Sequence, residues 1–413
     1  MTTNLAVVEA VEANLTLSRR FKVRFPQAEA LEAAQALETP GAEARVVNLK
    51  RQFLSVQVPF QVRGRAAAER QFDSSLRAYE EEFGGLVVED YRYDLEKDGP
   101  GLNGVQGPSL EDVLDLIRAV PAWDLSRGDG VTIAVVDTGI NGDRPEFPES
   151  KRQGAWQPLG DTPWTDWEGH GTMCACIAAG TKAEGGAFNG VAPEAGLIAC
   201  RTHFYDSELA TAYDYLIERV EQDALQIVAT NSFGVRRGTA PPEPVASDFL
   251  PALDEAIQKG IRVVFSAGNN HHLASGKPSE CHPTTIWQHK SQANLMTVAT
   301  CKLDGSMWFY SSRGPGHKFG APGTNHKPDV TAPTPEGGRI VYGDQIQALP
   351  NGWGTSGACP QVAGLAALLL AKAPALSREE LFNVIRNTAV DLGHGRDCQG
   401  AGRIDCLEAL LAV

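Results

Sequence analysis

Three short segments bracketed by glycine carry an aspartate, a histidine and a serine, the residue types of nucleophilic acyl transfer. Asp137 directly follows the apolar run 131–136 and precedes a turn-forming glycine. His170 stands between two glycines, and Ser356 stands just before a long apolar stretch. A serine hydroxyl becomes a strong nucleophile only when a neighbouring base takes its proton. In that chemistry a histidine is the base and a carboxylate orients its ring.

Each of these side chains also has a plainer interpretation when it is taken alone. Asp137 would cap the turn that follows its strand, and Ser356 would be the N-cap of a buried helix. His170 would be a loop histidine or a metal ligand, although no HExxH spacing favours a metal. The order Asp, His, Ser is one of those found in serine-nucleophile triads. The combination therefore favours catalysis over three separate structural roles.

The elements that would position these residues alternate between strand and helix after the first hundred or so residues. The apolar runs are continuous rather than alternating, which is typical of parallel strands buried on both faces. With helical stretches between them, they predict a doubly wound α/β sheet that carries its functional site at the carboxyl ends of the strands. The predicted strands are 131–136, 196–200, 227–231, 262–266 and 295–299, and the predicted helices include 210–222 and 249–259.

The first hundred residues have a different pattern. They read as strand, helix, strand, strand, helix, strand, which predicts a small ferredoxin-like α+β domain. A stretch rich in Gly, Pro, Asn and Ser follows and indicates an exposed linker. We predict an α+β domain at 1–96, a linker at 97–110 and an α/β domain at 111–413. Within the first domain the predicted strands are 20–25, 45–49, 53–60 and 86–95, and the predicted helices are 28–37 and 66–83.

Composition and charge argue against several classes of function. The net charge is −14 and no basic block would neutralise phosphates, so we expect no nucleic-acid partner. We also expect no membrane partner, because an acidic surface repels anionic lipid and no uninterrupted apolar run reaches the roughly 20 residues of a membrane helix. Glu9 and Glu12 interrupt the first apolar residues, unlike a secretory signal. We therefore expect a cytoplasmic location and leave secretion open.

The eight cysteines all lie after residue 170 and are too dilute for a disulfide scaffold. Buried, reduced thiols are the plain interpretation. In an oxidising compartment disulfides become an alternative. The pairs that we consider for it are Cys281–Cys301 and Cys398–Cys406.

From about residue 115 to the C-terminus, the sequence resembles the subtilisin-like serine peptidases. The resemblance rests on three motifs that occur together: Asp137-Thr-Gly, His170-Gly-Thr, and GWGTSGACPQVAG around Ser356. It implies a subtilisin-like fold and a serine endopeptidase that hydrolyses peptide bonds through an acyl-enzyme. Further segments that resemble the family are 190–193, 311–315, 328–333, 388–391 and 402–405.

The resemblance also implies a role for each site residue. Asp137, His170 and Ser356 would form the catalytic triad. Asn269 would donate its side-chain amide to the oxyanion, together with the backbone N–H of Ser356. The residues that would contact substrate are Ser232, Phe233, Gly234, Ala267 and Gly268.

Some segments depart from the usual sequence of the family. The stretch 270–287 should line part of the S1 side, so the resemblance leaves the specificity open. Three positions behind the serine carry unusual residues, and there we expect altered packing rather than lost chemistry. They are Gly357, Cys359 and Gln361.

Members of this family often bind calcium. Glu146 stands where one acidic ligand would lie, but the loop 180–189 lacks a run of oxygen-bearing side chains and contains Lys182. We expect no metal in the catalytic site and no required cofactor, and we keep bound calcium as an alternative.

The N-terminal domain resembles the propeptide of the family, which assists folding and then inhibits the enzyme. This implies an intramolecular inhibitory partner whose last strand ends near the active-site cleft. We expect autoprocessing between about Glu96 and Leu110, with a permanent N-terminal module as the alternative.

The expected external partner is a protein or peptide substrate. Two other functions remain as alternatives on this fold. One is a peptide ligase or cyclase that uses the same residues, and the other is a pseudopeptidase that serves as a binding module.

Overall fold

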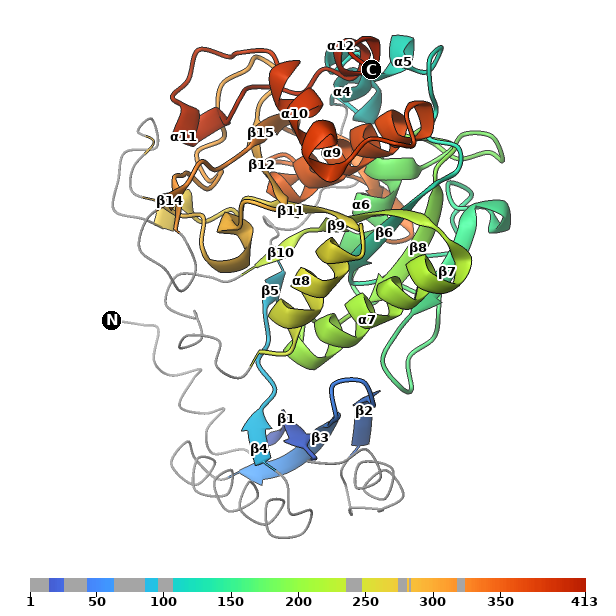
Figure 1. The fold of residues 1–413 in the computed structure, drawn as a ribbon, viewed down its shortest axis with the longest axis vertical. Helices are drawn as coiled ribbons and strands as arrows, with labels where there is room; N and C mark the ends of the chain where they lie inside the picture. The colour runs from blue at the N-terminus through green and yellow to red at the C-terminus, as the bar shows by residue number, and fades with distance from the viewer. Residues whose placement is uncertain are drawn as a thin grey trace.

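A computed structural model of the chain describes residues 15–25, 43–62, 86–95, 107–234, 247–273, 281, 284–317 and 324–413. These residues form a layered α/β body and a small N-terminal sheet that lies against one side of it (Figure 1). Both parts agree with the predicted fold class. The predicted linker lies mostly outside the described residues, so the domain boundaries stay predictions.

A seven-stranded sheet forms the centre of the α/β body, and every neighbouring pair of its strands is parallel. The order is β15-β12-β11-β9-β6-β8-β7, which confirms the doubly wound sheet. The order of the strands reverses around β6, and open α/β sheets place their sites at such a point. The strands are β6 (Val131–Asp137), β7 (Arg152–Trp156), β8 (Gly196–Arg201), β9 (Gln226–Asn231), β11 (Arg262–Ser266), β12 (Met296–Cys301) and β15 (Val330–Pro333).

Helices cover both faces of this sheet because successive side chains of a strand point to opposite faces. On one face, Ile133 packs in the core with α6 (His170–Ala179) and α9 (Gly354–Lys372). On the other face, Ala134 packs in the core with α7 (Asp206–Asp223) and α8 (Phe249–Gln258). The predicted helices 210–222 and 249–259 are therefore present, and α7 starts four residues earlier than expected.

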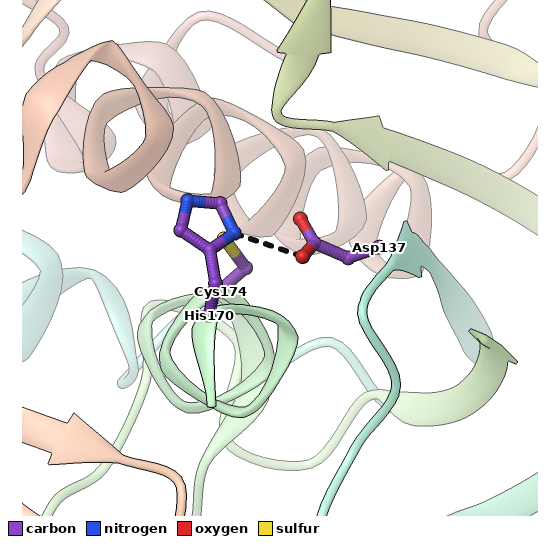
Figure 2. A group of neighbouring side chains, drawn as sticks. All are labelled: Asp137, His170 and Cys174. Atoms are coloured by element: carbon purple, nitrogen blue, oxygen red, sulfur yellow. Dashed lines mark hydrogen bonds and ion pairs between the residues drawn. The ribbon is translucent and has the colours of Figure 1, made fainter. Parts of the chain in front are cut away.

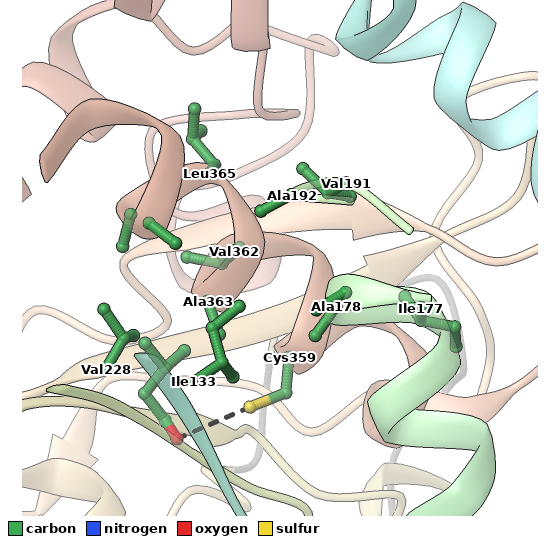
Figure 3. Packing of buried hydrophobic residues seen from close by; sticks show 14 of the residues in the cluster. Ile133, Ile177, Ala178, Val191, Ala192, Val228, Cys359, Val362, Ala363 and Leu365 are labelled. Carbon is green, nitrogen blue, oxygen red and sulfur yellow. Dashed lines mark hydrogen bonds between the residues drawn. The ribbon is translucent and has the colours of Figure 1, made fainter. Parts of the chain in front are cut away.

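Helix α9 runs through the first of these cores, where Cys359 and Ala363 lie beside Ile133 and Val228 of the sheet (Figure 3). By length and composition α9 would be able to cross a membrane, and 94% of its apolar window is buried inside the protein. It is therefore the core helix of the α/β body. The helix begins at Gly354, well before the run of leucines, so it is longer than the uninterrupted apolar run that the sequence shows.

Shorter elements complete the α/β body. Helix α4 (Leu110–Leu116) begins at a capping box, in which the Ser109 N–H donates to the Asp112 carboxylate at 2.7 Å. Leu110, Val113 and Leu114 of this helix are buried in the core of the α/β body. The remaining described elements are α5 (Ala119–Ala122), α10 (Arg378–Asn387), α11 (Arg396–Gln399), α12 (Cys406–Leu411), and the pairs β13 (Gly316–His317) with β14 (Thr324–Asn325) and β16 (Gly338–Tyr342) with β17 (Gln345–Leu349). Three 3-10 turns accompany them: η1 (Glu149–Lys151), η2 (His271–Leu273) and η3 (Gln288–Ser291).

The N-terminal sheet has the antiparallel order β2-β3-β1-β4. One strand separates β1 from β2, and one separates β3 from β4, which is the split arrangement of a ferredoxin-like fold. The helices predicted at 28–37 and 66–83 lie outside the described residues. The strands are β1 (Leu15–Arg24), β2 (Glu43–Asn48), β3 (Phe53–Val62) and β4 (Leu86–Glu89). The predicted strand 86–95 is in fact two strands, because β5 (Asp94–Leu95) leaves this sheet.

The disulfide pairing differs from both pairs considered from the sequence. Cys281 is bonded to Cys398, and their Cα atoms are 5.3 Å apart. Cys301 lies within β12 and Cys406 at the start of α12, and both are fully buried in the core. Their places in packed elements explain why those pairs were wrong. The other six cysteines are buried free thiols, which agrees with the plain interpretation.

Basic side chains of the N-terminal sheet meet carboxylates of the α/β body at α7 and α8. Lys22 is 1% exposed, and its Nζ lies 2.6 Å from Asp206 and 2.8 Å from Asp248. Arg20 pairs with Glu208 in the same buried layer. Two charges removed from water are stable only when they are paired in this way. Ion pairing is therefore a main feature of this contact.

Asp90, a buried carboxylate of the N-terminal part, also binds to the α/β body. Asp90 accepts hydrogen bonds from the Ser55 hydroxyl at 2.6 Å and from the Ser207 backbone N–H at 3.1 Å, in the first turn of α7. Burial raises the pKa of Asp90 to about 6, although the charge of Lys22 acts in the opposite direction. The N-terminal sheet thus supplies both a cation and a helix cap to α7.

We predict that Lys22→Met loosens the N-terminal sheet. The substitution leaves Asp206 and Asp248 buried without their cation, which typically costs about 3–5 kcal/mol. Hydrogen–deuterium exchange of β1 and β3 in the intact chain should then be faster by about 100-fold or more. The matched control is Lys50→Met, because the Lys50 side chain is 44% exposed in its pairs with Asp214 and Glu255. It should change exchange by less than about fivefold, and equal effects of the two variants would contradict the account.

Candidate active site

Asp137 is the last residue of β6 and lies at the carboxyl edge of the sheet. Its side chain is buried, and its Oδ1 accepts the Thr138 N–H at 2.7 Å and lies 2.8 Å from His170 Nδ1 (Figure 2). The turn after it needs glycine, since Gly139 has φ +115° and a Cβ there would lie 2.0 Å from the Thr165 carbonyl oxygen. The strand therefore ends with its carboxylate held toward the histidine.

His170 is the first residue of α6. The helix approaches the turn after β6 closely, and a Cβ on Gly171 would lie 2.1 Å from the Gly139 carbonyl oxygen. The carboxylate of Asp166 holds the start of the helix by accepting the N–H of Gly169 at 2.7 Å and that of Thr172 at 2.9 Å. This close contact brings the imidazole against Asp137.

The ring of His170 is poised for proton transfer. Burial is the largest single effect and opposes a charge on this ring, but Asp137 and Cys174 together outweigh it and raise the pKa of His170 well above its usual value. Its other nitrogen, Nε2, has no hydrogen-bond partner among the described residues. A base with one nitrogen held by a carboxylate and the other open is suited to take a proton from a hydroxyl group.

Ser356 lies in the first turn of α9 and is 1% exposed. Its carbonyl oxygen accepts a hydrogen bond from the Ser232 hydroxyl at 3.1 Å. The thiol of Cys174 lies 3.6 Å from the same oxygen and 3.8 Å from His170 Nδ1. The Cys174 thiol therefore lies close to both the Ser356 carbonyl group and the His170 ring. Cys174 was not among the residues expected from the sequence, although residues four apart on one helix share a face and both lie on α6.

Asn269 follows β11 at the same edge of the sheet. Its Oδ1 accepts the Thr355 N–H at 3.0 Å and the Thr355 hydroxyl at 2.9 Å. The same hydroxyl accepts the N–H of Gly268 at 3.1 Å, and Ala267 is tied to Val298 of β12 by a backbone hydrogen bond of 2.9 Å. These contacts fix the carboxamide next to Ser356, and a preorganised donor of this kind is what an oxyanion requires.

Ser232, Phe233 and Gly234 follow β9, and the short strand β10 (Phe233–Gly234) is paired antiparallel with β5. Phe233 faces Leu95, and Gly234 faces Asp94. Figure 1 shows β5 between the N-terminal sheet and β10. A segment of the same chain thus lies where the sequence predicted substrate backbone.

Residues 204–206 form a second backbone edge, which borders the segment 91–95 on the side away from β10. The Tyr93 N–H donates to the Phe204 carbonyl at 2.7 Å, and the Asp206 N–H donates to the Tyr91 carbonyl at 2.7 Å. The sequence analysis missed this edge. Its signal was the position of 204–206, just beyond the carboxyl end of β8, the strand next to β6.

The three unusual positions behind the serine are packing positions. A Cβ on Gly357 would lie 2.4 Å from Trp353 Cβ, so the ring of Trp353 takes the place of a side chain there. The Cys359 thiol lies 3.2 Å from the Thr230 hydroxyl, and Gln361 donates to the Pro333 carbonyl at 2.8 Å.

Glu146, the carboxylate considered as a calcium ligand, is already paired within the chain. Glu146 is fully buried, and its carboxylate accepts two hydrogen bonds from Arg144, both at 3.0 Å, and one from the Ala187 N–H at 2.7 Å. Lys182 in the same loop pairs with Glu111. The Arg144 guanidinium holds the position that a cation would need, so these residues do not fit a calcium ion.

Comparison with known proteins identifies the family. The model of the subtilase family matches residues 128–402. Subtilisin BL of Lederbergia lenta is 31% identical over 301 residues, which cover 70% of this chain and 97% of that protein. Thermitase of Thermoactinomyces vulgaris is 28% identical over 298 residues, covering 71% and 93%. A calcium-dependent protease of Nostoc sp. is 28% identical over 331 residues, but the match spans only 47% of that longer protein.

Solved structures show the same relationship. The chain is similar to MycP1 with its N-terminal propeptide removed, with a TM-score of 0.56, 25% identity, and coverage of 72% of this chain and 96% of the other. MycP1 from Mycobacterium smegmatis has a TM-score of 0.56 at 23% identity and covers 78% of this chain and 88% of its own, which supports the fold. Together with the family match over most of the α/β body, these similarities show that the chain belongs to the subtilase family of serine endopeptidases.

Proposed function

We propose that this chain hydrolyses peptide bonds with Asp137, His170 and Ser356 as its catalytic triad, and that it is made as a self-processing zymogen. The observation that carries the proposal is the buried 2.8 Å contact between Asp137 and His170 beside Ser356. Its substrate is a protein or peptide, as for the family.

In the proposed reaction His170 carries the proton, accepting it and then donating it in each of the two half-reactions. His170 Nε2 takes the hydroxyl proton of Ser356 while the serine oxygen bonds to the substrate carbonyl carbon. The Asn269 amide and the Ser356 N–H stabilise the resulting oxyanion. The C–N bond then breaks, and His170 passes its proton to the leaving amine. Water attacks the acyl-enzyme by the same route and restores the serine hydroxyl.

The zymogen part of the proposal rests on the segment 91–95. It is bordered by β10 on one side and by 204–206 on the other, as a bound peptide would be. An antiparallel partner of β10 that continued beyond Leu95 would next face Ser232, whose hydroxyl contacts Ser356. This register supports a scissile bond close to Glu96, at the start of the range expected from the sequence.

The compartment is also a matter of proposal. A stable Cys281–Cys398 disulfide favours an oxidising environment. We propose that the active enzyme works outside the reducing cytoplasm, which is the alternative that the sequence left open.

We predict that the acid limb of the activity profile lies above pH 6.5. His170 must be neutral to act as a base, and its raised pKa means that the ring stays protonated at higher pH than an ordinary histidine. A plot of kcat/KM against pH should therefore fall as pH decreases through this raised value. Asp137→Asn should shift the limb to lower pH and reduce kcat by about 10⁴-fold. An unshifted limb in that variant would show that Asp137 does not act on His170.

We predict that the wild type removes its own N-terminal domain and that Ser356→Ala does not. Intact-mass spectrometry should find the wild type cut close to Glu96, and the variant at full length. Purified active enzyme added to the variant should produce the same cut, which separates cleavage by this enzyme from cleavage by a contaminant. A wild type that hydrolyses peptides while it stays intact would instead establish a permanent N-terminal module.

We predict that the loop around Glu146 is stable without calcium. Removing divalent ions with EDTA should change Tm by less than about 2 °C, which is about 1 kcal/mol for a domain of this size. Arg144→Gln should lower Tm by several degrees, since it leaves the buried Glu146 carboxylate without its cation. A large fall in Tm with EDTA that calcium reverses would contradict the assignment of Arg144 as the built-in cation.

A further inference from the structure

A group of aromatic rings encloses the side chain of Tyr93 beside β10. Tyr93 is 3% exposed, and its ring centroid lies 6.0 Å from that of Phe233, 5.5 Å from Phe249 and 5.7 Å from His289, with the rings edge to face. Phe265 adjoins His289 with a centroid distance of 4.7 Å. We call the group Phe233, Phe249, Phe265 and His289 the Tyr93 cage.

The cage lies next to the substrate site that we propose, and the inference below rests on that proposed function. Tyr93 is two residues before Leu95, which faces Phe233 across the β5–β10 pair. When the N-terminal domain has left, the cage would receive the corresponding side chain of a substrate. With a scissile bond after Glu96, that is the fourth residue before the cut.

His289 is the unusual member of this cage. It is 1% exposed, and neither of its ring nitrogens has a hydrogen-bond partner among the described residues. Its ring instead packs against aromatic rings, with its centroid 5.6 Å from that of Phe249 and 6.2 Å from that of Phe233. Burying an imidazole without partners costs stability that an apolar residue would not. A site that required packing alone would be served better by leucine or phenylalanine.

We propose that His289 determines the specificity of the Tyr93 cage: the cage accepts an aromatic side chain only while His289 is neutral. At neutral pH the enzyme then prefers substrates with an aromatic residue at this position. In acid the preference fades, and the enzyme's own Tyr93 is released more readily.

The direction of this pH effect follows because the pKa of His289 differs between the filled and the open cage, which couples proton binding to the binding of the aromatic side chain. Burial among the cage rings and Tyr93, and then the charge of Lys290, lower the pKa of His289 well below its usual value. In an open, hydrated cage the ring would titrate closer to its ordinary range, near 6.5. Binding of an aromatic side chain therefore expels the proton, and its affinity should fall by up to about tenfold per pH unit below that range.

Other groups near the cage do not produce the same effect. Burial raises the pKa of the Tyr93 hydroxyl well above its usual value, so this group stays neutral in acid. Asp206 acts on Tyr93 and is paired with Lys22. Lys290 follows His289 directly in the chain, and burial raises the pKa of Asp254 on α8, whose carboxylate is bonded by Gln292 and Asn294. A matched variant of His289 keeps all of these groups unchanged.

The first test compares two peptides that copy residues 90–99, one with the natural Tyr93 and one with alanine in its place. The ratio of their kcat/KM values cancels the titration of His170 and of every charge that the peptides share. From pH 7.5 to 5.5 we expect this ratio to fall about tenfold in the wild type and to stay constant in His289→Leu and His289→Asn. A constant ratio in the wild type would overturn the inference.

The second test needs no catalysis and uses the full-length Ser356→Ala chain. Hydrogen–deuterium exchange of residues 86–95, corrected for intrinsic rates, should lose about tenfold in protection from pH 7.5 to 5.5. Ser356→Ala/His289→Leu should lose much less. Equal losses in both proteins would contradict the role of His289. An enzyme that cuts neither peptide while it shows the His289-dependent loss would refute the proposed function and leave the acid-sensitive cage standing.

Discussion

The buried hydrogen bond between Asp137 and His170 is the contact on which the rest of the site depends. It exists because β6 ends at the centre of a parallel sheet and α6 begins directly against the turn that follows. Gly139 and Gly171 allow the close approach, since a Cβ at either position would overlap a carbonyl oxygen. Asp137, together with Cys174, then outweighs the effect of burial on the ring and raises the pKa of the histidine. Backbone geometry thus sets the electrostatics of the site.

In the function that we propose, the N-terminal part of the chain occupies the surfaces that a substrate would use. The segment 91–95 takes both backbone edges beside Ser356, and its side chain Tyr93 fills the aromatic cage. Farther away, the buried pairs of Lys22 and Arg20 with carboxylates of the α/β body hold the sheet in place. Inhibition and folding assistance would follow from one arrangement: a strong ionic contact outside the cleft holds a peptide-like strand within it.

Much of the α/β body was predictable because its information is local. Continuous apolar runs marked the buried parallel strands, and short glycine-bracketed motifs marked the turns where Asp137, His170 and Ser356 lie. The order of the N-terminal strands also followed from their pattern. The edge strands β7 and β15 were not predicted as strands, since 152–156 is half-buried and mixed in character and 330–333 is only four residues long.

The features that were missed depend on contacts between distant residues. The Tyr93 cage is built from segments centred on 233, 249, 265 and 289, and no spacing in the sequence links them to one another or to Tyr93. The Cys281–Cys398 pair spans 117 residues, and many pairings are compatible with eight cysteines. The role of Arg144 was missed for a different reason. It stands two residues before Glu146, but only the fold shows that its guanidinium turns back onto that carboxylate.

The central claim is that Asp137 and His170 activate Ser356, and a mapped covalent label tests it most directly. The purified wild type and His170→Ala would be treated with a fluorophosphonate and digested, and the labelled peptide would be identified by tandem mass spectrometry. The account predicts one label per chain, on Ser356, in the wild type, and a rate of labelling in His170→Ala reduced by several orders of magnitude. A label on another serine, or equal labelling of Ser356 in both proteins, would contradict it.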